Sequence, residues 1–222
     1  MLHILNEIWL ARYDIGSGLG LTILVSVSAI IAGTMIGTGI GVVLTYAAWP
    51  LSFIARIYVD LLRGTPVLVL ILAAFYVPSV IHVNLNALEA GVVALAFFCG
   101  AHVGEVVRGA LQSITVGQVE AAKSIGLTFR KTFFYVLMPQ AIRQAIPAWT
   151  NAAVEIVKAT TLLSIIGVPE LILNTQQLIG RTFINLPFYL MVGILYFLID
   201  YGVERFGRYV DTRLSVAQGG IL

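Results

Sequence analysis

The chain is poor in charge and in cysteine. Charged residues make up 11% of its 222 residues, against about a quarter in soluble domains, and the mean hydropathy is +0.96. The single cysteine, Cys99, lies inside an apolar run, which excludes an intrachain disulfide framework and favours a small buried side chain. This composition and length predict one membrane domain and no sizeable soluble domain.

Motifs for enzyme chemistry and for metal binding are also missing. No lysine follows a glycine, so the chain has no phosphate-binding loop, and another polypeptide must bind ATP and Mg²⁺. His82 and His102 have no second ligand at metal spacing. No Ser/Lys or paired-aspartate arrangement supports an intramembrane enzyme. We therefore expect no catalytic residue, no metal site and no cofactor in this chain.

Apolar runs of membrane length predict five helices, since a span needs roughly 20 apolar residues. We expect spans near 20–47, 64–82, 87–107, 145–168 and 184–204. Pro66 and Pro78 mark boundaries or kinks of the second span. A polar segment at 108–144 separates the third span from the fourth. The predicted fold is an all-α membrane protein with a single domain over residues 1–222.

Lysine and arginine are distributed unevenly between the two sides of these spans. One side collects ten of them: Arg56, Arg63, Arg108, Lys123, Arg130, Lys131, Arg143, Arg205, Arg208 and Arg213. The other side has Arg12 and Arg181. Because cytoplasmic loops are enriched in these residues, we predict that the amino terminus lies outside, that the carboxyl terminus lies in the cytoplasm, and that segment 108–144 is cytoplasmic.

Glycines on the first predicted helix have the spacing that lets two helices approach closely, at Gly33, Gly37 and Gly41. A nucleotide-binding interpretation fails because no strand precedes them. The pattern therefore predicts helix packing.

The polar segment contains a short predicted helix at Val116–Ile125. Thr115 followed by Gln118 has capping-box spacing at its start, and Gly126 can end it with a left-handed cap. A helix of about ten residues is unstable alone in water, so it requires a partner surface. The alternative is an amphipathic loop that lies on lipid headgroups through its basic residues.

The residue order in this segment resembles the loop by which permease subunits of bacterial ABC importers dock onto their ATPases. It runs Glu120-Ala121-Ala122, then Gly126, then Val136-Leu137-Met138-Pro139. Further matches extend from about residue 16 to 213 and indicate the polar-amino-acid branch, the histidine, arginine and glutamine type. They are Arg63–Pro66, Val107–Ile114, Gly117–Gln118, Pro139–Arg143 and Asn151–Leu162 with Ile165–Gly167. Val136 and Met138 are mild departures, standing where Ile and Leu are usual.

The resemblance implies a type I importer permease with five transmembrane helices and a cytoplasmic coupling helix, in the bacterial inner membrane. It assigns the ATPase-coupling residues to Glu120, Ala121, Ala122, Gly126 and Pro139. It also implies two ATPase subunits, a second permease subunit (identical or paralogous) and an extracytoplasmic amino-acid-binding protein. We expect membrane lipid around the spans and no nucleic-acid partner.

Ionisable residues inside the fourth span are the candidate substrate path. Glu155 and Lys158 lie one turn apart, where each charge costs about 2.5–3.5 kcal/mol. Either they neutralise each other, or they line an aqueous cavity and contact the charged groups of an amino acid, with Glu155 favouring a cationic one. Asn151, Thr160 and Thr161 add neutral hydrogen-bonding groups.

Rival functions make different predictions. An ion-driven secondary amino-acid transporter acting as a homodimer would transport without an ATPase, but it leaves the Glu-Ala-Ala segment unexplained. A purely structural scaffold leaves the two intramembrane charges without a purpose.

Overall fold

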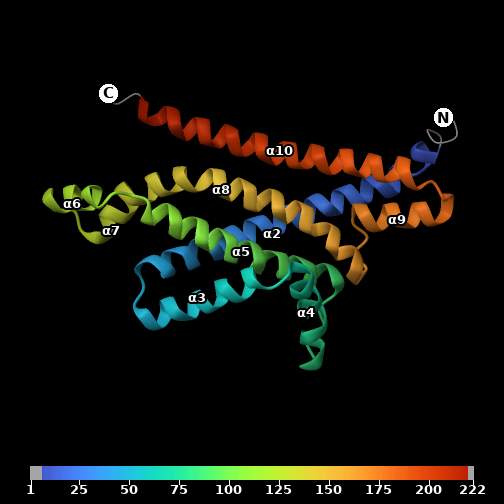
Figure 1. The fold of residues 1–222 in the computed structure, drawn as a ribbon, viewed down its shortest axis with the longest axis horizontal. Helices are drawn as coiled ribbons and strands as arrows, with labels where there is room; N and C mark the ends of the chain where they lie inside the picture. The colour runs from blue at the N-terminus through green and yellow to red at the C-terminus, as the bar shows by residue number, and fades with distance from the viewer. Residues whose placement is uncertain (1–6, 220–222) are drawn as a thin grey trace.

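The computed structural model describes residues 7–219, with side chains through Leu214, and every regular element in this range is helical. Four long helices run side by side (Figure 1): α2 (Arg12–Tyr46), α5 (Ala87–Gln112), α8 (Met138–Ala159) and α10 (Asn185–Gly219). Along one edge of this bundle lies α10. The opposite edge carries α3 (Trp49–Gly64) and α4 (Val67–Val80). At one end lie α6 (Val116–Ser124) and α7 (Phe129–Thr132), and at the other lies α9 (Leu171–Thr182).

Three helices, α2, α5 and α10, are each long and apolar enough to cross a membrane. Two bent helix pairs also qualify, and five crossings result if each pair is one span. The fold is therefore the all-helical, five-span arrangement that the apolar runs predicted.

The predicted helix at 64–82 is present as the shorter α4, and Pro66 marks its start as predicted. The sequence missed α3, which precedes it and is bent from it by 109° at Thr65 and Pro66. Pro66 lacks an N–H and disfavours helical geometry at the residue before it. The fourteen residues of α4 span about 21 Å, short of the ~30 Å hydrocarbon core. Because Arg56 and Arg63 interrupt the apolar pattern of α3, the sequence did not reveal it as a helix.

Helices α2 and α5 meet along the predicted glycine stripe. A Cβ added at Gly37 would lie 2.6 Å from the Val103 Cβ, and one at Gly41 would lie equally close to Val107. Gly33 packs in the same way against Cys99, which is 1% exposed. The predictions of close helix packing and of a buried cysteine are confirmed.

The sequence did not predict α9, whose amino-terminal end is fixed by a buried carboxylate. Glu170 has no exposed surface. It accepts hydrogen bonds from the backbone N–H groups of Ile172 and Leu173, each at 2.9 Å, and from the Tyr196 hydroxyl at 2.8 Å. Glu170 therefore caps α9 and ties it to α10.

The fourth and fifth predicted spans differ from the structure at their ends. The helix at 145–168 begins seven residues earlier as α8, and its last part, η2 (Thr160–Ile166), is a 3₁₀ helix that ends at Gly167 with a φ of 83°. The helix at 184–204 starts as predicted but continues to the end of the described chain. Thr150 of α8 packs directly on Gly207 of α10, where a Cβ would clash with the threonine side chain.

Candidate functional site

The short helix α6 lies at one extreme of the bundle (Figure 1) and starts and ends within one residue of the predicted helix. Gly126 has a φ of +79°, which confirms the predicted left-handed cap. The N–H of Gly126 donates to the Lys123 carbonyl at 2.9 Å, and the N–H of Leu127 donates to the Ala122 carbonyl at 3.0 Å. This pair of bonds is the Schellman motif, which favours glycine at this position.

The predicted capping box at the start of α6 is wrong. The Thr115 side chain makes no capping hydrogen bond; its carbonyl instead accepts the Gln118 N–H at 3.0 Å. The Gln118 side-chain oxygen lies 3.5 Å from the Gln140 amide nitrogen, at the start of α8. The Gln118 side chain is therefore directed toward α8. It does not reach back to the Thr115 N–H, which is the second hydrogen bond that a capping box requires.

The five predicted coupling residues differ in exposure. Glu120, Ala121, Gly126 and Pro139 are exposed, whereas Ala122 is 3% exposed. Ala122 therefore packs inside the protein, because α6 lies against the segment that follows α7. A partner can reach the face that carries Glu120 and Ala121. Pro139 is the second residue of α8 and follows the π-helical segment Phe133–Leu137 directly.

A π-helix, η1 (Phe133–Leu137), joins α7 directly to α8. Such π turns are rare and often occur at functional positions. Phe129 and Phe133 pack edge-on against Tyr46 at the end of α2, with ring centroids 5.3 and 5.8 Å away. The polar segment is therefore connected without a flexible linker to α8 and, through these rings, to α2.

The polar face of α8 carries Asn151, Glu155 and Lys158, all exposed in the single chain. Among the described residues, Lys158 pairs with Asp200 of α10, with Nζ 3.7 Å from Oδ2, rather than with Glu155. In this structure the ion pair of Lys158 is therefore formed across helices and not within α8. Because Lys158 already has a counter-charge, Glu155 remains available to a charged ligand.

Glu155 and Asn151 line an open pocket of about 400 Å³ between α8, α5 and the end of α3. The other polar groups in its wall are Arg63, His102 and Glu105. Thr160 and Thr161 are not in this pocket; their hydroxyls donate to the carbonyls of Val157 and Lys158, each at 2.7 Å. The structure therefore brings together two of the five predicted substrate-path residues and adds three that were not predicted.

Glu105 is the centre of a cluster that the sequence showed only in part. Its side chain is 14% exposed and lies 2.5 Å from Arg56, 2.6 Å from Arg108 and 4.0 Å from Arg63. The pairing with Arg108 follows from spacing along one helix, but Arg56 and Arg63 come from α3. Arg63, with the longest of these distances, also faces the pocket.

We expect Glu105→Ala to lower the free energy of unfolding by about 2 kcal/mol, because it leaves three guanidinium groups without their shared carboxylate. Asp60→Asn is the matched control: Asp60 lies 3.9 Å from Arg56 but is 66% exposed, so its loss should change stability by less than about 0.5 kcal/mol. Thermal unfolding of both variants in detergent measures this. Equal melting temperatures would contradict a structural role for the cluster.

The sequence is similar to those of known transport proteins. The family model described as binding-protein-dependent transport system inner membrane component matches residues 29–216. The probable amino-acid ABC transporter permease protein YckA of Bacillus subtilis (strain 168) is 32% identical over 82% of this chain and 80% of its own length. The glutamine transport system permease protein GlnP of Escherichia coli (strain K12) is 29% identical over 95% of this chain and 97% of its own.

Solved structures agree in fold. A crystal structure of an amino acid ABC transporter with histidines matches with a TM-score of 0.85 and 28% identity, over 93% of this chain and 97% of that one. An inward-facing structure of the MetNI methionine ABC transporter has the same fold, with a TM-score of 0.80 at 21% identity. This chain belongs to the family of inner-membrane components of binding-protein-dependent transport systems.

Proposed function

We propose that this chain is the membrane-spanning subunit of an ATP-driven importer for a polar amino acid. The observation that carries the proposal is α6, a glycine-capped helix at the extreme of the bundle with Glu120 and Ala121 exposed. The chain works with two ATPase subunits, which bind ATP and Mg²⁺, with a second permease subunit, and with an extracytoplasmic protein that delivers the amino acid. The names of the relatives support this substrate class.

The chain runs from α6 to the pocket through a turn at 125–128, then α7, η1 and α8. When the ATPases close, they move α6; η1 passes the movement to α8 without a flexible linker, and α8 carries Asn151 and Glu155. The movement is a rigid-body switch between inward-facing and outward-facing states. ATP binding and pocket opening are therefore reciprocally coupled.

The pocket suits the two charges that every amino acid carries. The Glu155 carboxylate can accept hydrogen bonds from an α-ammonium group, and the Arg63 guanidinium can pair with an α-carboxylate. Asn151 supplies a neutral donor and acceptor in the same pocket. A cationic side chain adds a second group that Glu155 can bind.

The orientation of the chain in the membrane can be tested by introducing one cysteine at a time. We expect Glu120→Cys to crosslink to the ATPase subunit and to resist a membrane-impermeant maleimide in intact cells. Arg181→Cys, exposed on α9 at the opposite end, should be labelled from outside and should not crosslink. The native Cys99 is buried and contributes little background. Labelling of the Glu120→Cys variant from outside would contradict both the topology and the docking surface.

Glu155→Gln tests the substrate site. The change keeps the shape and removes the charge, so we expect uptake of basic amino acids to fall roughly tenfold, equivalent to one lost charge-assisted hydrogen bond of about 1.4 kcal/mol. Uptake of neutral amino acids should fall less. Competition assays with labelled amino acids measure the ratio, and Glu204→Gln, exposed on α10 outside this pocket, is the control. Unchanged selectivity would remove Glu155 from recognition.

The ion-driven alternative lacks support from the family, whose description is of a binding-protein-dependent system. It would predict uptake by the purified chain in vesicles without any ATPase. We expect no such uptake.

A further inference from the structure

A second cavity, unlike the polar pocket, lies where α2, α5, η1 and α8 meet. It encloses about 220 Å³, and its walls are almost entirely carbon. Its lining includes Val42, Val107, Leu111, Phe133, Ile142 and Trp149. At one end the Trp149 indole N–H donates to the Thr34 hydroxyl at 2.8 Å. Because these polar groups bond to each other, this apolar slot offers no partner to a polar ligand.

The size and shape of the slot indicate its occupant. An apolar cavity of about 150 Å³ stays dry and accepts hydrocarbon, and the slot is likewise lined almost entirely by carbon. Its lining on α8 runs from Met138 to Trp149, about 16 Å along the helix. Ile142, 48% exposed, leaves the slot open at the surface. A long, narrow apolar space parallel to membrane helices matches an acyl chain.

Charge at the α6 end of the slot indicates the headgroup. Arg130 and Lys131 are exposed on α7, and Phe133, just after them, lines the slot. Tyr46 and Phe129 lie at the same end, as expected for residues at the membrane surface. Clusters of basic residues next to membrane helices attract anionic lipids. We propose that the slot binds one acyl chain of an anionic phospholipid, with its phosphate at Arg130 and Lys131.

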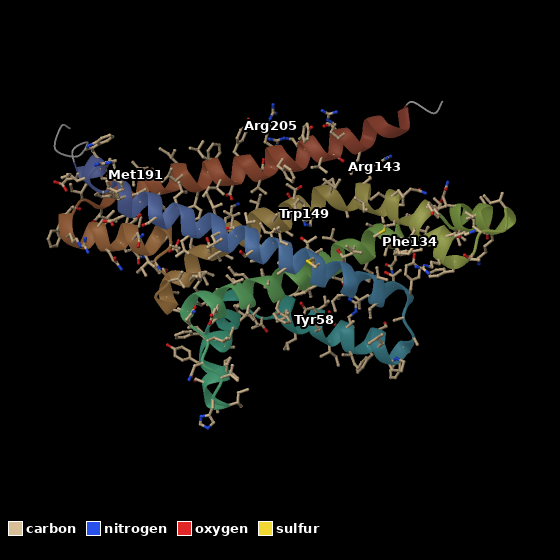
Figure 2. All side chains as sticks on the ribbon, turned by 180° about the vertical axis from the view of Figure 1, so that it is seen from behind. Tyr58, Phe134, Arg143, Trp149, Met191 and Arg205 are labelled. Carbon is tan, nitrogen blue, oxygen red and sulfur yellow. The ribbon has the colours of Figure 1, made fainter. Side chains whose placement is uncertain are left out.

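This site lies beside the connection between α6 and α8. The bound acyl chain packs against η1 and the first half of α8, so it supports the π-helical segment that joins α7 to α8. Figure 2 shows Trp149 between α2 and α8, with Phe134 toward the α6 end and Arg205 apart from both on α10.

Tryptophan fluorescence tests the proposal directly. Trp9 and Trp49 are replaced by Phe in the full chain, which leaves Trp149 as the single reporter. The protein is placed in vesicles of phosphatidylcholine, with phosphatidylglycerol brominated along its acyl chain added in steps. We expect stronger quenching by brominated phosphatidylglycerol than by brominated phosphatidylcholine. Each basic residue should contribute about fivefold in apparent affinity, and the double variant R130Q/K131Q should lose on the order of 25-fold.

Variants that fill the slot, compared with control variants outside it, test whether the lipid binds in the slot. Ala145→Phe fills it, and Thr38→Phe fills it from the α2 wall if the first variant fails to fold. Both should abolish the preference for phosphatidylglycerol. R205Q/R213Q removes the same charge from α10, and Gly202→Leu alters a separate groove that also contacts Trp149; both should retain the preference. Equal quenching by the two lipids would overturn the proposal. So would quenching that appears only after a dimer is separated, since a second copy would then occupy the slot.

Discussion

Gly37→Ala should lower the free energy of unfolding by about 2–3 kcal/mol, because an added Cβ has no room between α2 and α5. It would lie 2.6 Å from the Val103 Cβ, 2.7 Å from the Gly100 carbonyl oxygen and 2.9 Å from the Gly104 nitrogen. Two of these three atoms belong to backbone, which cannot rotate away. The two helices must therefore separate along their whole contact.

Gly39→Ala is the control, because it is the same chemical change two residues along the same helix. No atom lies within 4 Å of a Cβ at Gly39, and replacing glycine by alanine in a helix gains about 1 kcal/mol. The two variants should therefore shift stability in opposite directions. Cys99 provides the measurement: it is the single cysteine, it is 1% exposed, and it lies in this interface. A thiol-reactive dye should label it only on unfolding, and equal labelling temperatures would contradict the packing argument.

Gly126→Val should reduce ATP-driven uptake about tenfold or more while the protein still inserts in the membrane. In the left-handed conformation a residue with a Cβ carries a conformational free-energy cost of roughly 1–2 kcal/mol. A β-branched residue such as valine is rarely found there at all. The C-terminal turn of α6 then unwinds, and both hydrogen bonds that end the helix are lost. The surface offered to the ATPase loses its shape.

Gly126→Asn separates conformation from side-chain size, because asparagine tolerates this geometry; it should retain most of the uptake. Gly117→Val places the same valine near the other end of α6, where no atom lies within 4 Å of a Cβ. Uptake should be normalised to the amount of permease in the membrane. A Gly126→Val variant as active as Gly117→Val would mean that the cap is unimportant for coupling.

Features that depend on neighbours in the chain were predictable. The extent of α6 and its cap follow from local turn chemistry at Gly126, and the contact of α2 with α5 follows from glycine spacing at Gly33, Gly37 and Gly41. Both signals are periodic or local, so one sequence contains all the information that they need.

Features that depend on the register between helices were not predictable. Spacing along one helix offered only Glu155 as a possible partner of Lys158, whereas the partner in the structure, Asp200, lies on α10. Arg56 reaches Glu105 only because α3 folds back along α5. Helix α9 is short and mixed in polarity, so it lacks the continuous apolar run by which spans are recognised.

The break between α3 and α4 bears on how the chain is made. As the ribosome delivers residues 49–80 to the insertion machinery, α3 brings three charges and α4 is too short to cross alone. Asn86 and Glu89 form a capping box that starts α5 after a short loop at 81–86. We expect α4 to be retained in the bilayer only once α5 has emerged, so that the two enter together as a helical hairpin.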